Sequence, residues 1–411
     1  MKRRTFLGAA MTAPMISTAA WSQEALSMWA RSDVANVIRP FVDTFNAKGK
    51  TQIKLDIVVA REMVQKYAAA AAARSAPDFL LLDLIYTPAF ASADQLQDLS
   101  PWTKEMPYFQ SLSPAHRKLG ELDGKLYGLP FSAEGSVLVY NKKLFREAGL
   151  DPEKPPKNWG EITDAAVKIR ALGGDRYGYY VPGAGAAAFR FLPVVWANGG
   201  EVLSADGKKA TIDSPQLREA IGFYRDLWAK KVMPESVVAD TGPDALTGFA
   251  AGRVGMTITG AFAIGVLTTR YPDVEFGVTP IPGKTGGFAS FAGGDNIVVS
   301  RGTRKLPAIR EFVDFAYSLE GQSLLGKYGS LPVRGDIAAA ALKENDPRYL
   351  TVAEAVNKGG RTPRSTVYND LFNSLNGPWV TLHQRAIFGN DVDGAIAQAQ
   401  ATFQRIINEA N

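Results

Sequence analysis

The chain has 411 residues, of which 46% are hydrophobic and 21% charged, with a formal net charge of +5, two histidines and no cysteine. This composition is typical of a globular protein, and the length favours two domains over one. The absence of cysteine excludes disulfides, thiolate metal ligands, cysteine nucleophiles and a lipid-bearing cysteine. His116 and His383 lie far apart in the sequence, which argues against zinc catalysis and histidine triads, so we expect no metal site and no cofactor.

The N-terminus has the pattern of an export signal. It reads MKRRTFLGAAMTAPMISTAAWSQ, with a basic start, a stretch of small and apolar residues and a polar end. RRTFLG is similar to the twin-arginine export motif, so we expect residues 1–22 to be a signal peptide cleaved after Ser22 or Ala20. The alternative, a membrane anchor, is disfavoured because the apolar stretch is short. Cleavage removes three basic residues and no acid, which lowers the net charge from +5 to +2. The sequence thus predicts a soluble periplasmic protein without a nucleic-acid partner.

Strands and helices alternate along the first part of the mature chain. The segment 77–84, PDFLLLDL, is apolar on both faces, as is typical of a buried parallel strand. The alternation at short spacing predicts a βαβ sheet. The predicted strands are 25–33, 53–60 and 77–84, and the predicted helices are 37–49 and 62–75.

The rest of the chain continues the mixture of helices and strands. The segment 182–200 is small and apolar, and both a helix and a loop fit it. The pattern predicts helices over 158–174, 214–231, one or two within 307–329 and most of 365–409, and strands over 254–260, 274–283 and 296–300.

One long segment resembles a known family. GKLYGLPFSAEGSVLVYNKKLFREAGLDPEKPPKNWGEITDAAVKI (124–169) is similar to the hallmark segment of bacterial extracellular solute-binding proteins, family 1, the maltose-binding-protein-like receptors of carbohydrate-type ABC importers. It has a Tyr-Gly-hydrophobic-Pro entry, a strand ending in Tyr-Asn, and a Leu-Phe-x-x-Ala-Gly-Leu helix end, followed by a Pro-rich turn and Trp-x-Glu. Further matches are FAAGRVGMTITGAF (249–262), GGDN (293–296) and SLPVRGD (330–336).

The resemblance implies an α/β fold of two lobes, each a sheet flanked by helices, with a ligand cleft at the hinge. The chain is expected to cross between the lobes near 131–134, near 259–262 and within 300–320. The first lobe would comprise 23–132 and about 261–310, and the second 133–260 and about 311–411.

Acidic residues at strand ends are the first candidate ligand contacts. Ligands of open α/β sheets bind at the carboxyl ends of strands, and sugars need bidentate hydrogen bonds to vicinal hydroxyls. Asp33 and Asp83 end predicted strands, and Tyr86 follows in the next loop; helix capping is the competing role for both acids. The resemblance places Glu134 at a crossing, facing the cleft, with a helix cap or a surface ion pair as the alternatives.

Aromatic residues are candidates because flat rings cover the C–H faces of sugars. Phe262 matches a family position often held by Trp, Trp196 precedes ANGG, and Trp379 corresponds to a tail aromatic with Tyr368 as its competitor. Core packing is the alternative for Phe262 and Trp196.

The remaining candidates are backbone-exposing and polar residues. Gly294, Asp295 and Asn296 are predicted, with Gly293, to form a loop before a strand, where glycine lets the backbone approach a ligand; a plain turn is the alternative. Arg334 in LPVR is similar to a family position near the cleft, and a surface ion pair competes with that role.

The resemblance implies a monomeric receptor without catalysis. It would capture a sugar or polyol, close by a hinge motion and dock on the membrane permease subunits of an ABC importer. One alternative keeps the fold but binds a glycerol phosphate or sugar acid through Arg31 and Arg334. Another is a periplasmic glycoside hydrolase with Glu134 and Asp83 as its carboxylates.

Overall fold

The structure is a computed structural model that describes residues 25–184, 188–242 and 244–410. The expected signal peptide, residues 1–22, lies outside the described residues. Within the described part, none of the helices combines the length and the hydropathy needed to cross a membrane.

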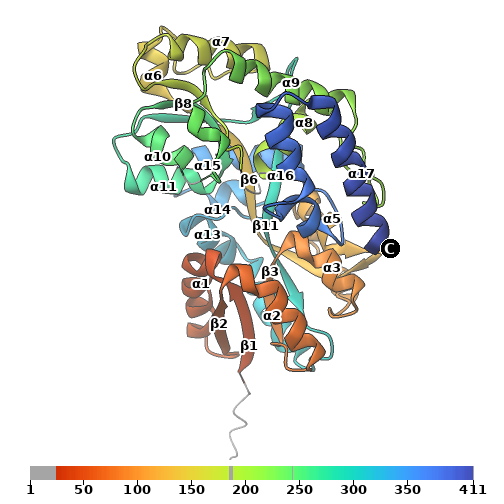
Figure 1. The fold of residues 1–411 in the computed structure, drawn as a ribbon. Helices are drawn as coiled ribbons and strands as arrows, with labels where there is room; N and C mark the ends of the chain where they lie inside the picture. Colours follow the sequence, from red (N-terminus) through yellow and green to blue (C-terminus); the bar gives the residue numbers. More distant parts are fainter. Residues whose placement is uncertain (1–24, 185–187, 243, 411) are drawn as a thin grey trace, which may run out of the picture.

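Helices and strands alternate along the described residues (Figure 1). The strands are β1 (Leu26–Arg31), β2 (Ile53–Val58), β3 (Phe79–Asp83), β4 (Glu121–Leu122), β5 (Lys125–Leu126), β6 (Gly128–Asn141), β7 (Tyr177–Tyr180), β8 (Val254–Gly260), β9 (Phe276–Thr279), β10 (Ile281–Pro282), β11 (Phe288–Val299) and β12 (Gly360–Arg361). The α-helices are α1 (Ala35–Ala47), α2 (Ala60–Ala72), α3 (Thr87–Ser92), α4 (Ser100–Thr103), α5 (Pro114–Gly120), α6 (Lys142–Glu147), α7 (Trp159–Arg170), α8 (Ala188–Ala197), α9 (Pro215–Ala229), α10 (Asp244–Ala250), α11 (Phe262–Arg270), α12 (Leu306–Ala316), α13 (Leu319–Lys327), α14 (Ala338–Ala341), α15 (Arg348–Gly359), α16 (Pro378–His383) and α17 (Val392–Ala410). Shorter helical turns are η1 (Ser32–Val34), η2 (Leu84–Tyr86), η3 (Phe109–Ser111), η4 (Glu235–Val238), η5 (Asn369–Asn373) and η6 (Gln384–Phe388).

Two long antiparallel strands, β6 and β11, connect two groups of strands. The first half of β6 pairs with β11, which in turn pairs with β3, and the order continues to β1 and β2. The second half of β6 pairs with β8 and β9, and β8 pairs with β7. In Figure 1 the first group lies below and the second above, with β6 and β11 running between them. This is the two-lobed α/β architecture that the resemblance implied.

The N-terminal sheet confirms the predicted βαβ pattern. β1 pairs with β2 and β3 in parallel, and α1 and α2 follow β1 and β2. The side chains of β3 alternate between two apolar clusters: Phe79 and Leu81 face one, while Leu80 and Leu82 face the other. All four are fully buried, and burying each contributes roughly 2 kcal/mol, so β3 is held from both faces.

The division of the chain between lobes stays a prediction, but one pairing bears on it. β9 pairs with the same half of β6 as β8 does. This favours assigning 276–279 to the lobe that contains β8, whereas the boundaries predicted from the sequence put about 261–310 in the other lobe.

The predicted loop at GGDN is wrong: these residues lie inside β11, which begins at Phe288 and not at residue 296. A Cβ on Gly294, whose φ is +131°, would lie 2.0 Å from the carbonyl oxygen of Ser132 on β6. The glycine therefore allows the two strands to approach, and the register shifts between Asp295 and Asn296 as in a β-bulge. The glycines that suggest a turn in the sequence allow a distortion of a strand in the structure.

Candidate functional site

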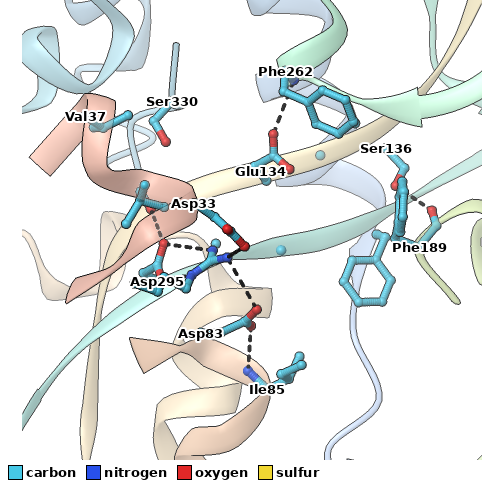
Figure 2. A pocket seen from close by; sticks show the side chains of 18 of the residues that line it. Asp33, Val37, Asp83, Ile85, Glu134, Ser136, Phe189, Phe262, Asp295 and Ser330 are labelled. Atoms are coloured by element: carbon cyan, nitrogen blue, oxygen red, sulfur yellow. Dashed lines mark hydrogen bonds and ion pairs between the residues drawn. The ribbon is translucent and has the colours of Figure 1, made fainter. Parts of the chain in front are cut away.

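A cavity of about 510 Å³ lies where β6 and β11 join the two groups of strands (Figure 2). Its size falls in the range of small-molecule sites. The residues that line it are Arg31, Asp33, Val34, Asn36, Val37, Asp83, Ile85, Ser132, Glu134, Gly135, Ser136, Ala188, Phe189, Gly260, Phe262, Phe291, Gly293, Gly294, Asp295, Tyr328, Gly329, Ser330, Tyr368 and Asn373.

The strand topology brings charged residues to one edge of the sheet. β1 and β3 are parallel, so their last residues, Arg31 and Asp83, reach the same edge. β11 runs antiparallel to β3, and its Asp295 is the register partner of Asp83. Asp83 lies at the end of β3, as the sequence predicted, whereas Asp295 reaches the same place from within β11.

Arg31 is the centre of this cluster. Its Nε donates to Asp295 Oδ1 at 2.8 Å and its Nη2 to Asp295 Oδ2 at 3.2 Å, which is a two-pronged ion pair. Nη1 lies 3.4 Å from Asp33 Oδ2 and 4.0 Å from Asp83 Oδ2. Burial alone would lower the pKa of Arg31, but the charges of Asp295 and Asp83 raise it above its ordinary value. Arg31 is therefore a fixed cation whose donors already serve this chain's own carboxylates.

Asp83 combines two roles that the sequence presented as alternatives. It lines the cavity, and its Oδ1 also accepts a hydrogen bond from Ile85 N–H at 3.3 Å, capping η2. Burial raises the pKa of Asp83 to about 6, although the charge of Arg31 lowers it. Asp33 lines the same cavity with a largely exposed side chain.

Glu134 lies midway along β6, opposite Gly293 of β11, and lines the cavity. Its Oε1 accepts a hydrogen bond of 3.2 Å from the backbone N–H of Phe262, the first residue of α11. The helix-start contact considered from sequence is thus present together with the cavity-facing position. Burial raises the pKa of the Glu134 carboxyl to about 7, against the lowering effect of the Phe262 hydrogen bond and of Arg31.

Aromatic rings form part of the cavity wall. Phe262 lines the cavity, and its side chain is 40% exposed. Phe189, Phe291 and Tyr368 also line the cavity. In Figure 2 the Phe262 and Phe189 rings lie on one side of the cavity, across from Asp83.

Two predicted tryptophans do not line the cavity. Trp379 is fully buried among aromatic residues of the C-terminal helices, including Phe372 at 5.5 Å between ring centroids, and its competitor Tyr368 lines the cavity instead. Trp196 is 3% exposed and stacks on Phe291, with centroids 6.0 Å apart, so it supports a cavity residue from behind. Core packing, the alternative for Trp196, describes its environment.

Two predicted polar residues also lie away from the cavity. Asn296 is fully buried, and its Nδ2 donates to Thr87 Oγ1 at 2.9 Å, because successive side chains of a strand point to opposite faces of the sheet and Asp295 takes the cavity side. Arg334 pairs with Asp336, donates to Tyr317 O at 2.9 Å and stacks over the Tyr108 ring. Its surroundings match the ion-pair alternative.

Tyr86 belongs to a smaller neighbouring cavity of about 200 Å³. That cavity shares Arg31, Asp33 and Asp83 with the larger one. Tyr86 therefore lies beside the main cavity and not on its wall.

The sequence interpretation missed several wall residues, among them Asn36, Ser136, Phe189, Tyr328 and Ser330. Ser136 Oγ donates to Phe189 O at 2.5 Å, which ties α8 to β6. Phe189 sits in the segment 182–200, where small apolar residues gave no clear periodicity. The long strand 128–141 was the available signal for Ser136, two residues beyond Glu134 on the same strand face.

The buried side chain of His116 supports the floor of the cavity. Nε2 of His116 donates to the carbonyl oxygen of Gly293 at 2.7 Å, and its Nδ1 is 2.7 Å from Ser113 Oγ. Burial lowers the pKa of His116 to about 4, so the ring is neutral near pH 7. Across the described ranges, no cluster of three acidic or histidine side chains has the geometry to hold a metal ion.

Comparison with known proteins gives one family. The family model described as "Bacterial extracellular solute-binding protein" matches residues 31–323. Proteins of Brucella abortus and Brucella suis are 30% identical over 220 residues, 53% of this chain and 53% of their own, so the match spans about half their length. The diacetylchitobiose-binding protein DasA of Streptomyces coelicolor is 28% identical over 88% of this chain and 84% of its own.

Solved structures agree with the fold. An ABC transporter solute-binding protein from Thermotoga lettingae, bound with alpha-D-tagatose, superposes with a TM-score of 0.79 at 25% identity, covering 93% of this chain and 99% of that one. Since the family model matches well over half of the sequence, the chain belongs to the bacterial extracellular solute-binding proteins.

Proposed function

We propose that this chain is the substrate-binding receptor of an ABC importer. It acts in the periplasm after export by the twin-arginine-type signal peptide, captures a sugar or sugar-like polyol, and delivers it as a monomer to the membrane permease subunits. The observation that carries this proposal is the cavity itself, where carboxylates from η1, β3, β6 and β11 meet aromatic rings between two groups of strands. Carboxylates accept hydrogen bonds from hydroxyls, and rings cover C–H faces.

The ligands named for the relatives support a carbohydrate class. DasA is named for diacetylchitobiose, and the Thermotoga lettingae structure holds alpha-D-tagatose. Both are polyhydroxylated molecules of the kind that a cavity with several acceptor side chains suits.

The charges of the cavity disfavour the anionic-ligand alternative. Four acidic side chains line it, and the guanidinium of Arg31 is already bonded to Asp295 and Asp33. Arg334, the second cation that this alternative needs, stacks on Tyr108 outside the cavity. A glycerol phosphate or sugar acid would thus meet an excess of negative charge.

We assign no chemical step to this site. Members of the family are solute-binding receptors, and Glu134 and Asp83 are both held by hydrogen bonds of this chain, from Phe262 N–H and Ile85 N–H respectively. Incubation with aryl glycosides should therefore release no product, whereas turnover that is lost in a Glu134→Gln variant would favour the hydrolase alternative.

Ligand capture would work by closure of the two strand groups about β6 and β11. β6 pairs with β11 of the first group and with β8 and β9 of the second, so bending within β6 changes the width of the cavity. A ligand that contacts both sides favours the closed population by its difference in affinity for the two states.

A thermal-shift screen of the mature chain tests the proposal. The panel holds neutral mono- and disaccharides, polyols, amino sugars, sugar acids and glycerol phosphates. A ligand at 100 times its Kd stabilises the folded state by about 2.7 kcal/mol, which raises the melting temperature by a few degrees. A shift with neutral sugars or polyols is expected; shifts restricted to the anionic compounds, or none at all, would contradict the proposal.

A further inference from the structure

The wall around Glu134 differs from the rest of the cavity. The other three acids, Asp33, Asp83 and Asp295, lie within 4.0 Å of Arg31. Glu134 has no cation within that distance among the described residues, and its recorded donor is the neutral backbone N–H of Phe262. Figure 2 shows Glu134 between Phe262 and the three other acids.

An aromatic ring lies directly beside this carboxylate. A Cβ on Gly260 would lie 2.6 Å from Cε1 of Phe262 and 3.2 Å from Oε2 of Glu134. Two ring carbons of Phe262 and the carboxylate oxygen of Glu134 therefore approach the same point of β8, and the missing side chain of Gly260 makes room for them. Glu134 and Phe262 both line the cavity, so a ligand substituent that reaches this part of the wall meets a carboxylate and an exposed aromatic ring together.

The charges of the side chains that line the cavity indicate which charge a ligand substituent carries at this position. Arg31 is the single lysine or arginine among the described residues that line the cavity, against four acids. Its guanidinium faces Asp295, Asp33 and Asp83 and can offset at most one of their charges, so the cavity keeps an excess of acids. Glu134 is the acid of this set that has no cation within 4.0 Å among the described residues and that lies beside an exposed ring. A positively charged group is attracted by both a carboxylate and the face of an aromatic ring, and more strongly where water is excluded.

We propose that the ligand is a polyhydroxylated molecule with a protonated amino group, and that this ammonium binds between Glu134 and Phe262. The inference rests on the proposed function, because the hydroxyls of the same molecule would bond to the acids around Arg31. Asp83 and Asp33 accept hydrogen bonds from hydroxyls at that end, while Glu134 receives the ammonium at the other. The site thereby distinguishes an amine from a hydroxyl at one position of the ligand.

Matched ligand pairs test this directly. Isothermal titration at neutral pH compares glucose with glucosamine, galactose with galactosamine, mannose with mannosamine, and sorbitol with 1-amino-1-deoxysorbitol. Each pair differs by one amino group in place of one hydroxyl. In at least one pair, the amine should bind about tenfold more tightly or better, and the preference should weaken as salt is added.

Substitutions test which side chain is responsible for the preference for the amine. Glu134→Gln keeps the size and the hydrogen-bonding oxygen but removes the charge, so the ratio of the two Kd values should fall towards one. Phe262→Leu should reduce the ratio by a smaller factor. Glu409→Gln, an acid on the exposed side of α17, is the matched control and should leave the ratio unchanged.

The outcomes separate this inference from the proposed function. If neutral sugars bind and no amine binds more tightly than its match, the inference is overturned while the receptor function stands. A preference for amines that persists in Glu134→Gln also overturns it. If no neutral or amino compound of either panel binds, the proposed function fails, and the inference fails with it.

Discussion

Arg31 and Asp295 form a two-pronged ion pair across the sheet, with Nε–Oδ1 at 2.8 Å and Nη2–Oδ2 at 3.2 Å. The two residues lie 264 positions apart in the sequence, and Asp295 is 1% exposed. The pair joins β1 to β11, which lies between β3 and β6 in the sheet. It therefore links the acidic wall of the cavity to the strand that pairs with β6, and β6 reaches both groups of strands.

Replacing Arg31 should destabilise the protein strongly. Arg31→Met keeps much of the side-chain volume but leaves Asp295 buried without its cation, which typically costs about 3–5 kcal/mol. Urea unfolding measures the loss. Arg405→Met is the control, since Arg405 pairs with Glu409 on the exposed face of α17 and should change the unfolding free energy by less than about 0.5 kcal/mol. Similar losses in both variants would contradict the buried ion pair.

Glu134 should make stability depend on pH. Its pKa is raised from 4.5 to about 7 by burial, so between these values the folded state holds more protons than the unfolded state. Stability therefore falls as pH rises through this window, by about 3 kcal/mol at most. Asp83, raised from 3.8 to about 6, acts in the same direction at lower pH.

Urea unfolding at several pH values between 4.5 and 8 tests this titration. Glu134→Gln should flatten the upper part of the profile, from about pH 6 to pH 7.5, and leave the part due to Asp83. The charges near Glu134 are those of Arg31, Asp295 and Asp83, and the variant keeps all three. An unchanged slope in the variant would show that Glu134 does not carry the raised pKa.

Two aromatic residues should respond in opposite ways to substitution. Trp379→Ala empties a fully buried position and should cost about 3–5 kcal/mol of stability, while the folded fraction keeps its ligand affinity. Phe262→Ala removes a ring that is 40% exposed, so stability should change by less than about 1 kcal/mol and ligand affinity should fall several-fold or more. Denaturation and titration of both variants measure the two effects. If the roles were reversed, the assignment of Trp379 to the core would be wrong.

Gly294 should not tolerate a side chain. Gly294→Ala places a Cβ against the carbonyl oxygen of Ser132 at a φ of +131°, which pushes β11 away from β6. Gly124→Ala is the control: it has a φ of +75° and open space around it, so it bears backbone strain alone. The cost at 294 should exceed that at 124 by at least about 2 kcal/mol in urea unfolding, and ligand affinity should fall because Asp295 moves. Equal costs would mean that the close approach of the strands is not required.

The features of the fold that depend on local interactions could be predicted from local patterns in the sequence. The strand ending at Asp83 was visible because apolar residues occupy both of its faces, and the start of α7 was visible in Asn158, whose Oδ1 accepts from Glu161 N–H at 2.9 Å. The positions of Asp83 and Glu134 on the cavity wall followed from strand ends and from the family resemblance.

Features that depend on distant contacts were not predictable in this way. Gly294 reads as part of a turn, since nothing in the sequence shows that the carbonyl of Ser132 lies beside it. From the sequence, Trp379 is predicted to cover a ligand, but in the structure Phe372 and the other rings of the C-terminal helices enclose it. Phe189 gave no signal because its role depends on how α8 packs against β6 and β11.

The crystal structure of the mature chain with the tightest ligand of the thermal-shift panel tests the central claim most directly. The account predicts one polyhydroxylated ligand in the cavity between the two strand groups, with hydroxyls bonded to Asp83 or Asp33 and a substituent against Glu134 and Phe262. Ligand density outside this cavity, or a complex in which none of these four side chains touches the ligand, would contradict it.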